Sequence, residues 1–429
     1  MELHPGTLGA QRRSGSGRRV TSRVSMQERE PSTQAPVAPL PPVVAPATTP
    51  ARRPRRAVLA VALVLVVVAL LATGLAVAYG IERRPGGAAV PAVPTVPAPT
   101  ASRQPALRDL MPPTVRVGSA ADGRWMSLDA EYGELLGSEF DAITPENAMK
   151  WGNLEPSPDV YTWAGADQLV GFAEQHDQSV YGHTLLGRSD VPRWVDPQWS
   201  AEQLRTVLRD HVTTVVSRYR GRVWAWDVIN EALDEDGSLR DTMWLRKLGP
   251  GYVAEVFRWA HAADPGARLF INDYGVEGRT RKADGLLDLV RELRRAGVPV
   301  DGVGFQSHLR WDEQPRDMVG NLRRFARLGV SVAITELDVR IALPETPAKR
   351  DRQAALYRKV LQACLAVPAC VSFTVWGFSD ARSWIPSYHA GYGAACIFDA
   401  ALVPKPAHAA LMDQLRRLPS PTGAGPGPG

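Results

Sequence analysis

Cysteine is scarce in this chain of 429 residues. Its three cysteines are Cys364, Cys370 and Cys396, too few for the disulfide framework of a small secreted domain. Two interpretations remain for the close pair Cys364 and Cys370. They form a disulfide if this part of the chain lies outside the cell, or they are two buried thiols. We favour the bridge, and we expect Cys396 to be a thiol in the core.

Lysine is missing from the first 84 residues, which hold twelve arginines and four acidic residues and so carry a charge of +8. The whole chain has 50 basic and 45 acidic residues, which leaves 38 basic and 41 acidic residues beyond position 84, a charge of −3. Binding to nucleic acid needs a basic surface, and this larger part is mildly acidic. We therefore expect no nucleic-acid partner.

Charge is also missing from residues 57–79, a stretch of 23 residues rich in Val, Leu and Ala. About 20 apolar residues are enough for a helix to span a bilayer. The cluster Arg52-Arg53-Pro54-Arg55-Arg56 precedes the stretch, and basic flanks favour the cytoplasmic side. We expect a single-pass anchor in the cell membrane, in contact with the lipid bilayer, with the N-terminus inside and the rest outside.

A cleaved signal is the alternative for this stretch. Ala76-Val77-Ala78 fits a small-residue cleavage site, and Arg55-Arg56 resembles a twin-arginine start. However, the apolar run is longer than the roughly 7–15 residues of a signal core.

Low-complexity segments flank the remaining parts. Residues 1–56 are rich in Arg, Pro, Ser and Thr and are predicted to be a disordered basic cytoplasmic tail. Residues 80–105 are predicted to be a Pro- and Ala-rich linker, and residues 417–429 a disordered Pro- and Gly-rich tail. One folded domain is left, over residues 106–416.

This domain has no glycine-rich phosphate turn after its first apolar run, which weakens the case for an open doubly wound sheet. Eight short apolar runs alternate with amphipathic segments, a pattern typical of an α/β protein with a (β/α)8 TIM barrel. The expected strands are Val115–Ala120, Ala142–Thr144, Ser179–His183, Val223–Asn230, Arg268–Asp273, Gly302–Gln306, Ser331–Glu336 and Val371–Trp376. The clearest expected helices are Ala201–Tyr219, Tyr252–Ala263, Thr280–Ala296, Pro315–Leu328 and Lys349–Ala366.

Two of the expected strands lead to a glutamate, because Glu231 directly follows Val223–Asn230 and Glu336 is the last residue of Ser331–Glu336. In a TIM barrel, functional side chains gather where the strands end. Two carboxylates that face each other across a cleft are suited to cutting a glycosidic bond. The histidines and cysteines show no close metal-binding spacing, so we expect neither a metal nor another cofactor.

The residues at the strand ends carry a specific resemblance. The chain resembles glycoside hydrolase family 10, the family of endo-β-1,4-xylanases, over essentially the whole domain. The matching stretches are Thr144-Pro145-Glu146-Asn147-Ala148-Met149-Lys150-Trp151, Gly182-His183-Thr184-Leu185, Trp226-Asp227-Val228-Ile229-Asn230-Glu231, Gly302-Val303-Gly304-Phe305-Gln306-Ser307-His308, Ile334-Thr335-Glu336-Leu337-Asp338-Val339 and Phe373-Thr374-Val375-Trp376-Gly377.

The resemblance implies a retaining mechanism in which Glu231 is the general acid and base and Glu336 is the nucleophile. Asn230 would hydrogen-bond the sugar 2-hydroxyl, and His308, backed by Asp338, would orient Glu336. The residues implied in substrate binding are Glu146, Asn147, Lys150, His183, Gln306, Trp376 and Trp384; the two tryptophans offer flat faces to sugar rings.

One segment departs from the family pattern. Where the family reads Gly-His-Thr-Leu-Val-Trp-His-Ser-Gln, this chain has Gly187 for the tryptophan, Arg188 for the second histidine and Asp190 for the glutamine. Losing the tryptophan removes a stacking surface. Arg188 adds a positive charge that weakens Glu231 as an acid unless Asp190 pairs with it. The arginine is also suited to binding an acidic sugar.

Three hypotheses about function follow. The first is an endo-1,4-β-xylanase that acts on xylan-type polysaccharide by double displacement. The second is a glycosidase with the same mechanism that acts on another or acid-decorated β-glycan. The third is a surface glycan-binding protein with little turnover, which the intact pair of glutamates argues against. In each case the partner is a polysaccharide or oligosaccharide, and we expect a monomer.

Overall fold

The computed structural model describes residues 104–418. Within this range, no helix is long and apolar enough to cross a membrane. The predicted anchor at residues 57–79, the tail before it and nearly all of the linker and C-terminal tail lie outside the described residues.

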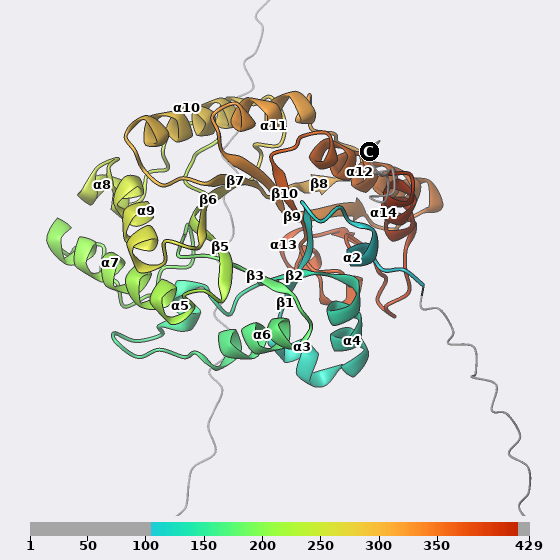
Figure 1. Cartoon of the computed structure of the whole chain (residues 1–429), viewed down its shortest axis with the longest axis horizontal. Helices are drawn as coiled ribbons and strands as arrows, with labels where there is room; N and C mark the ends of the chain where they lie inside the picture. Colours follow the sequence, from blue (N-terminus) through green and yellow to red (C-terminus); the bar gives the residue numbers. More distant parts are fainter. Residues whose placement is uncertain (1–103, 419–429) are drawn as a thin grey trace, which may run out of the picture. The chain divides into compact units, whose positions relative to one another are not determined.

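Eight parallel strands form a closed ring at the centre of the domain (Figure 1). Around the ring the order is β1, β2, β3, β5, β6, β7, β9 and β10, and β10 closes it by pairing with both β9 and β1. These strands are β1 (Arg116–Ala121), β2 (Ala142–Pro145), β3 (Ser179–Gly182), β5 (Val223–Asn230), β6 (Arg268–Asp273), β7 (Gly302–Phe305), β9 (Ser331–Ala342) and β10 (Cys370–Val375). The predicted (β/α)8 TIM barrel is therefore confirmed, and the open sheet is excluded.

Three short strands extend the barrel at the ends of its main strands. They are β4 (Leu186–Gly187), which pairs with β5, and β8 (His308–Arg310) and β11 (Tyr392–Gly393), which pair with β9.

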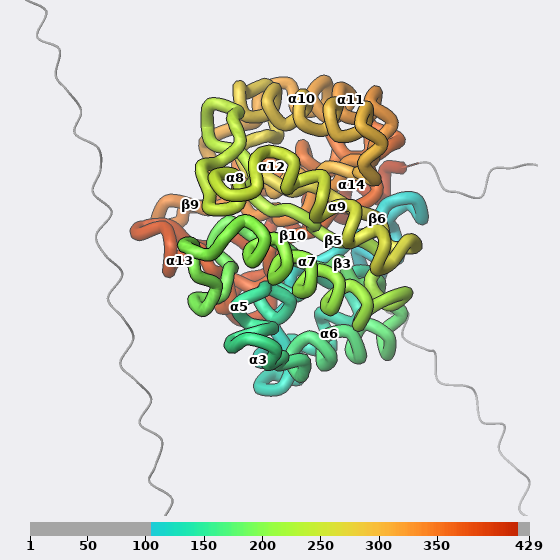
Figure 2. The backbone as a smooth tube through the Cα atoms, turned by 90° about the vertical axis from the view of Figure 1, so that its left-hand side faces the viewer, coloured from blue at the N-terminus to red at the C-terminus, as the bar shows by residue number. Residues whose placement is uncertain are grey.

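Helices surround the ring and cover its outer face (Figure 1). Seen from the side, α7 and α9 lie next to each other outside the strands (Figure 2). The helices are α2 (Leu107–Leu110), α3 (Gly123–Leu128), α4 (Ala130–Glu139), α5 (Trp151–Leu154), α6 (Ala164–Gln175), α7 (Ala201–Arg218), α8 (Met243–Leu248), α9 (Tyr252–Ala263), α10 (Arg281–Arg295), α11 (Met318–Ala326), α12 (Pro347–Leu365), α13 (Ile385–Tyr388) and α14 (Pro406–Arg416), with a 3-10 turn η1 (Asp380–Arg382).

Apolar side chains form two separate clusters. The large one fills the layer between the strands and the helices, where Trp226 of β5 packs near Tyr219 at the end of α7. The small one joins Tyr181, Phe270 and two alanines from β5 and β9. Side chains alternate along a strand, so neighbours of the outward Trp226 face the barrel interior. Asp227 is one of them, and the Tyr181 hydroxyl donates to it over 2.8 Å.

The prediction that the seventh strand ends at Glu336 is wrong. Strand β9 continues to Ala342, because Val339 and Ile341 stay buried and the strand gains the partners β8 and β11. Glu336 thus lies inside a strand that is paired on both sides, which fixes its backbone more firmly than a loop would.

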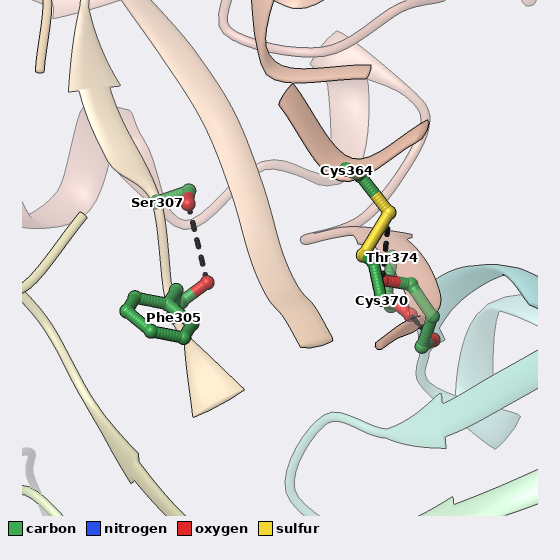
Figure 3. The surroundings of a disulfide bond; sticks show 6 residues. Phe305, Ser307, Cys364, Cys370 and Thr374 are labelled. Carbon is green, nitrogen blue, oxygen red and sulfur yellow. Dashed lines mark hydrogen bonds between the residues drawn. A yellow bond between two sulfur atoms is a disulfide. The ribbon is translucent and has the colours of Figure 1, made fainter. Parts of the chain in front are cut away.

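Cys364 near the end of α12 and Cys370 at the start of β10 form a disulfide (Figure 3). The bond closes the short connection between these two elements, and both cysteines are buried. Cys396 is a free, buried thiol.

Gly182 shows how tightly the neighbouring strands β3 and β5 pack against each other. A Cβ atom at this position would lie 2.2 Å from the Trp226 ring, and both residues are buried. We expect Gly182→Ala to lower the free energy of unfolding by about 1–3 kcal/mol, because overpacked side chains force the structure to shift.

Gly171 in α6 provides the control for the same chemical change. Nothing lies within 4 Å of a Cβ atom there, so Gly171→Ala is expected to gain up to about 1 kcal/mol from helix propensity. Denaturant unfolding of both full-length variants checks the pair, and equal effects of the two substitutions contradict the packing argument.

Candidate functional site

Glu336 is the most constrained acidic side chain at the strand ends. Its Oε1 accepts a hydrogen bond from Asn272 Nδ2 at 2.6 Å, and its Oε2 lies 3.1 Å from Nε2 of His308. The side chain is almost fully buried. Burial opposes ionisation, but the hydrogen bond from His308 and the positive charges of His183 and His308 hold the pKa of Glu336 below its usual range. The structure thus keeps this carboxylate ionised.

His308 lies between two carboxylates. Its Nδ1 is 3.0 Å from Asp338 Oδ2, and its Nε2 faces Glu336. Burial disfavours the charged imidazole, but Asp338 and Glu336 outweigh it and raise the pKa of His308 to about 10. Both ring nitrogens therefore donate at neutral pH, and the imidazolium is fixed in place by Asp338.

Asn272, the last residue but one of β6, forms hydrogen bonds with the neighbours of both glutamates. Its amide nitrogen also donates to Asn230 Oδ1 at 3.0 Å, and its backbone carbonyl accepts from the N–H of Glu231 at 2.8 Å. The hydroxyl of Thr335 donates to Asn272 Oδ1 at 2.8 Å. That contact fixes which end of the amide faces Glu336. Asn272 was not among the predicted site residues.

His183 and Asp227 form a second buried pair beside Glu336. Nδ1 of His183 lies 2.8 Å from Asp227 Oδ2 and 4.0 Å from Glu336 Oε1. Burial opposes the charge on His183, but the two carboxylates raise its pKa. The Trp376 ring is buried and meets His183 edge-on, with ring centroids 5.1 Å apart. Trp376 thus packs against the histidine and supports it.

One atom each of His183, Asp227 and Glu336 lies within 4.8 Å of the others, close enough to hold a metal ion. These side chains are already engaged, because His183 bonds to Asp227 and both oxygens of Glu336 accept hydrogen bonds. The donor set therefore fits a hydrogen-bond network better than a coordination site.

Glu231 has different surroundings from Glu336. It follows β5 directly, with a φ of 61°, and its side chain is 23% exposed. Its ion-pair partner is Arg188, whose Nη1 lies 3.6 Å from Glu231 Oε2. The sequence left open whether Asp190 pairs with Arg188 and so shields Glu231 from its charge. Among the described residues Asp190 forms no ion pair with Arg188. Of the two glutamates, Glu231 thus has the more exposed carboxylate.

Asn230 and Gln306 lie between the two glutamates. Nε2 of Gln306 donates to Asn230 Oδ1 at 3.0 Å, and both residues are buried. With Asn272 as its second donor, the Asn230 oxygen is saturated, so its amide hydrogens remain for another acceptor.

Three of the predicted binding residues follow β2. Lys150 Nζ donates to Asn147 Oδ1 at 3.2 Å. Burial raises the pKa of Glu146, and the nearby Lys150 opposes that shift. Lys150 also lines a cavity of about 360 Å³ together with Asp190 and Arg193. This group is polar and only partly buried, as hydroxyl binding requires.

Trp384, at the start of α13, has a contact that the sequence did not predict. Its indole N–H donates to Asp338 Oδ2 at 2.7 Å, and its ring meets His308 edge-on at 4.9 Å. Trp384 therefore helps to hold Asp338, the carboxylate that holds His308.

Asp227 and Asn272 are two residues to which sequence reasoning assigned no role in the site. Both occupy inward positions near the ends of strands, and both are almost completely buried. A buried polar side chain at the end of a barrel strand is the signal that points to them.

The raised pKa of His308 predicts a pH-dependent stability. An unfolded histidine titrates near pH 6.5 and folded His308 near 10. The stabilisation is therefore complete below about pH 6.5 and is lost as pH rises toward 10. We expect the difference in unfolding free energy between wild type and His308→Gln to be largest at pH 6 and to shrink up to pH 10.

Glu336 does not interfere in this window, because its lowered pKa confines its own contribution to acid pH. The exposed His261 on α9 supplies the control substitution, His261→Gln. A difference for His308→Gln that stays constant from pH 6 to 10 contradicts the imidazolium assignment.

The chain is similar to known proteins over the whole barrel. Glycosyl hydrolase family 10 matches residues 106–414. An endo-1,4-beta-xylanase of Agaricus bisporus is 42% identical over 299 residues, which cover 69% of this chain and 90% of that protein. Endo-1,4-beta-xylanase B of Thermotoga neapolitana is 40% identical over 304 residues, covering 70% and 88%.

Solved structures agree with the sequence matches. Xylanase 10B from Thermotoga petrophila RKU-1, in complex with xylobiose, superposes with a TM-score of 0.72 at 39% identity and covers 73% of this chain and 98% of that one. Native xylanase 10B from Thermotoga maritima gives 0.71 at 41% identity, covering 72% and 98%. On the family match and these relatives, this chain belongs to glycosyl hydrolase family 10.

Proposed function

We propose that the protein is a retaining endo-1,4-β-xylanase in which Glu336 is the nucleophile and Glu231 the general acid and base. The observation that carries the assignment is the contrast between the two carboxylates. His308 and Asn272 hold Glu336 as an ionised, oriented group. The Glu231 side chain is partly exposed, and neither of its carboxylate oxygens accepts a hydrogen bond from the described residues. The relatives named as endo-1,4-beta-xylanases support xylan as the substrate class.

The reaction proceeds in two balanced steps. A Glu336 oxygen attacks the anomeric carbon, the glycosidic C–O bond breaks, and the leaving oxygen takes its electron pair and the proton of Glu231. Water then adds to the same carbon and gives a proton to Glu231, and the bond to Glu336 breaks. Two inversions give net retention and return both residues to their starting states.

The neighbouring residues have supporting roles in these steps. His308 and Asn272 fix the direction in which Glu336 attacks, because each binds one of its oxygens. The free amide hydrogens of Asn230 suit the sugar 2-hydroxyl, a contact that strengthens in the transition state. Lys150, Asn147 and Glu146 are placed to bind hydroxyls of the neighbouring sugar units.

Substituting the two glutamates separates their roles. Glu336→Gln is expected to abolish hydrolysis of both xylan and a dinitrophenyl β-xylobioside, because no nucleophile remains. Glu231→Gln is expected to lower kcat on xylan by about 10²–10⁴ and to spare only the first release of dinitrophenolate, which needs no proton, whereas the later hydrolysis of the glycosyl-enzyme needs the base. The steady-state rate on xylan and the pre-steady-state burst of dinitrophenolate provide the measurement.

Glu255→Gln is the control, since Glu255 forms a partly exposed ion pair with Arg205 on the outer helices. Full activity of Glu336→Gln on either substrate would falsify the assignment. If the wild type binds xylan without cleaving either substrate, the protein is a glycan-binding member of the fold instead.

The location of the enzyme is a separate part of the proposal. The uncharged residues 57–79, with the arginine cluster before them, support an anchor that holds the hydrolase on the outer side of the cell membrane. We expect the full chain to sediment with membranes and to resist a carbonate wash, and deletion of residues 57–79 to release it. Wild-type protein that appears in the medium, cleaved after Ala78, indicates the secreted alternative.

A further inference from the structure

The segment that departs from the family pattern lies directly beside Glu231. Strand β4 runs parallel to β5, with Leu186 opposite Ile229 and Gly187 opposite Asn230. Arg188 therefore follows the last paired residue of β4, and Glu231 follows the last paired residue of β5. The pairing register, which the sequence does not reveal, is what brings the arginine to the acid and base.

Gly187 leaves room that a neighbouring acid fills. A Cβ atom at Gly187 would lie 2.2 Å from Asp190 Oδ2, so the Asp190 carboxylate lies over the glycine. The backbone of Asp190 is tied to α5, because its carbonyl accepts from the N–H of Gly152 at 2.7 Å. Asp190 is thus held away from Arg188, and the guanidinium is left to face Glu231.

Arg188 and Glu231 both line a cavity of about 550 Å³, a size that suits a small ligand. Its six charged lining residues form three ion pairs, namely Arg188 with Glu231 at 3.6 Å, Arg240 with Asp234 at 2.7 Å and Arg246 with Asp241 at 2.8 Å. The cavity is therefore balanced in charge while Glu231 is ionised.

The first of these pairs cannot persist through the reaction. Glu231 must carry a proton to act as the acid, and a neutral carboxyl no longer balances Arg188. The other two pairs remain, so the cavity then has a charge of +1. At 3.6 Å the Arg188–Glu231 contact is also longer than a hydrogen bond. Arg188 is 50% exposed, so its donors are available to a ligand.

We propose that Arg188 binds the carboxylate of a uronic acid substituent, which makes this enzyme selective for acid-decorated xylan. The inference rests on the proposed xylanase function and names its substrate class. A guanidinium forms two parallel hydrogen bonds with a carboxylate, the strongest of the common polar contacts. The bound carboxylate supplies the negative charge that Glu231 gives up on protonation. An acidic substituent therefore assists the chemical step as well as binding.

Three matched substrates test the proposal on the full-length protein. They are a neutral β-1,4-xylooligosaccharide, the same chain with one glucuronosyl substituent, and that chain with the carboxyl reduced to an alcohol. The reduced form keeps the shape and removes the charge. For wild type we expect kcat/KM on the acidic substrate to exceed that on the reduced one by about 10- to 100-fold.

Three variants assign the effect to Arg188. Arg188→Gln is expected to bring the ratio of acidic to reduced substrate to about 1, and Arg188→Lys to leave an intermediate ratio, since lysine keeps the charge without the planar fork. Arg246→Gln is the matched control, because Arg246 lines the same cavity and is paired with Asp241. It is expected to keep the wild-type ratio.

The outcomes distinguish this inference from the proposed function. A wild-type ratio near 1 with active hydrolysis of neutral xylan overturns the inference alone. A ratio that survives in Arg188→Gln, or that Arg246→Gln abolishes equally, assigns acid recognition elsewhere and also overturns it. Wild-type protein that cleaves none of the three substrates overturns the xylanase function, and the inference falls with it.

Discussion

The hydrogen bond from Asn272 to Glu336 is the contact on which the rest of the site depends. The Asn272 amide is the shared donor of three acceptors, Glu336, Asn230 and Asp227, from two other strands. Its backbone carbonyl also positions the N–H of Glu231. One residue therefore positions Glu336, which is the proposed nucleophile, the amide of Asn230, and the backbone at Glu231, the proposed acid and base. The four side chains of this network, Asn272, Glu336, Asn230 and Asp227, are buried, so an unpaired member would cost the full desolvation penalty.

The barrel makes this contact possible by leaving space around it. A Cβ atom at Gly304 of β7 would lie 2.3 Å from Asn272 Oδ1 and 2.9 Å from Thr335 Cγ2. Only a residue without a side chain lets the Asn272 amide lie across β7 and reach Glu336 on β9. The hydroxyl of Thr335 then fixes the direction of the amide. The ordering is thus built from strand to strand around the ring, and loops contribute little to it.

The sequence predicted the barrel well, because alternation and apolar runs report directly on which residues are buried. The bounds of β5 and β6 match their predictions in full. The end of β9 was missed because the pattern after Glu336 is set by partners, β8 and β11, that lie elsewhere in the chain. Asn272 and the indole contact of Trp384 were missed for the same reason. Each depends on a neighbour on a strand that is distant in the sequence, and one residue's type says nothing about that neighbour.

The two glutamates show how one fold gives the same side chain two opposite environments. Glu336 lies inside a long strand, buried and flanked by positively charged histidines, and that setting stabilises the anion. Glu231 lies just past the end of a strand, at the wall of a cavity, with an arginine rather than a fixed network beside it. Protonation of Glu231 disturbs only this one exposed pair, whereas protonation of Glu336 would break a buried network. In the proposed mechanism the proton therefore moves on and off the carboxylate whose surroundings change least, and Arg188, the residue most affected, is the proposed contact for the acidic substituent.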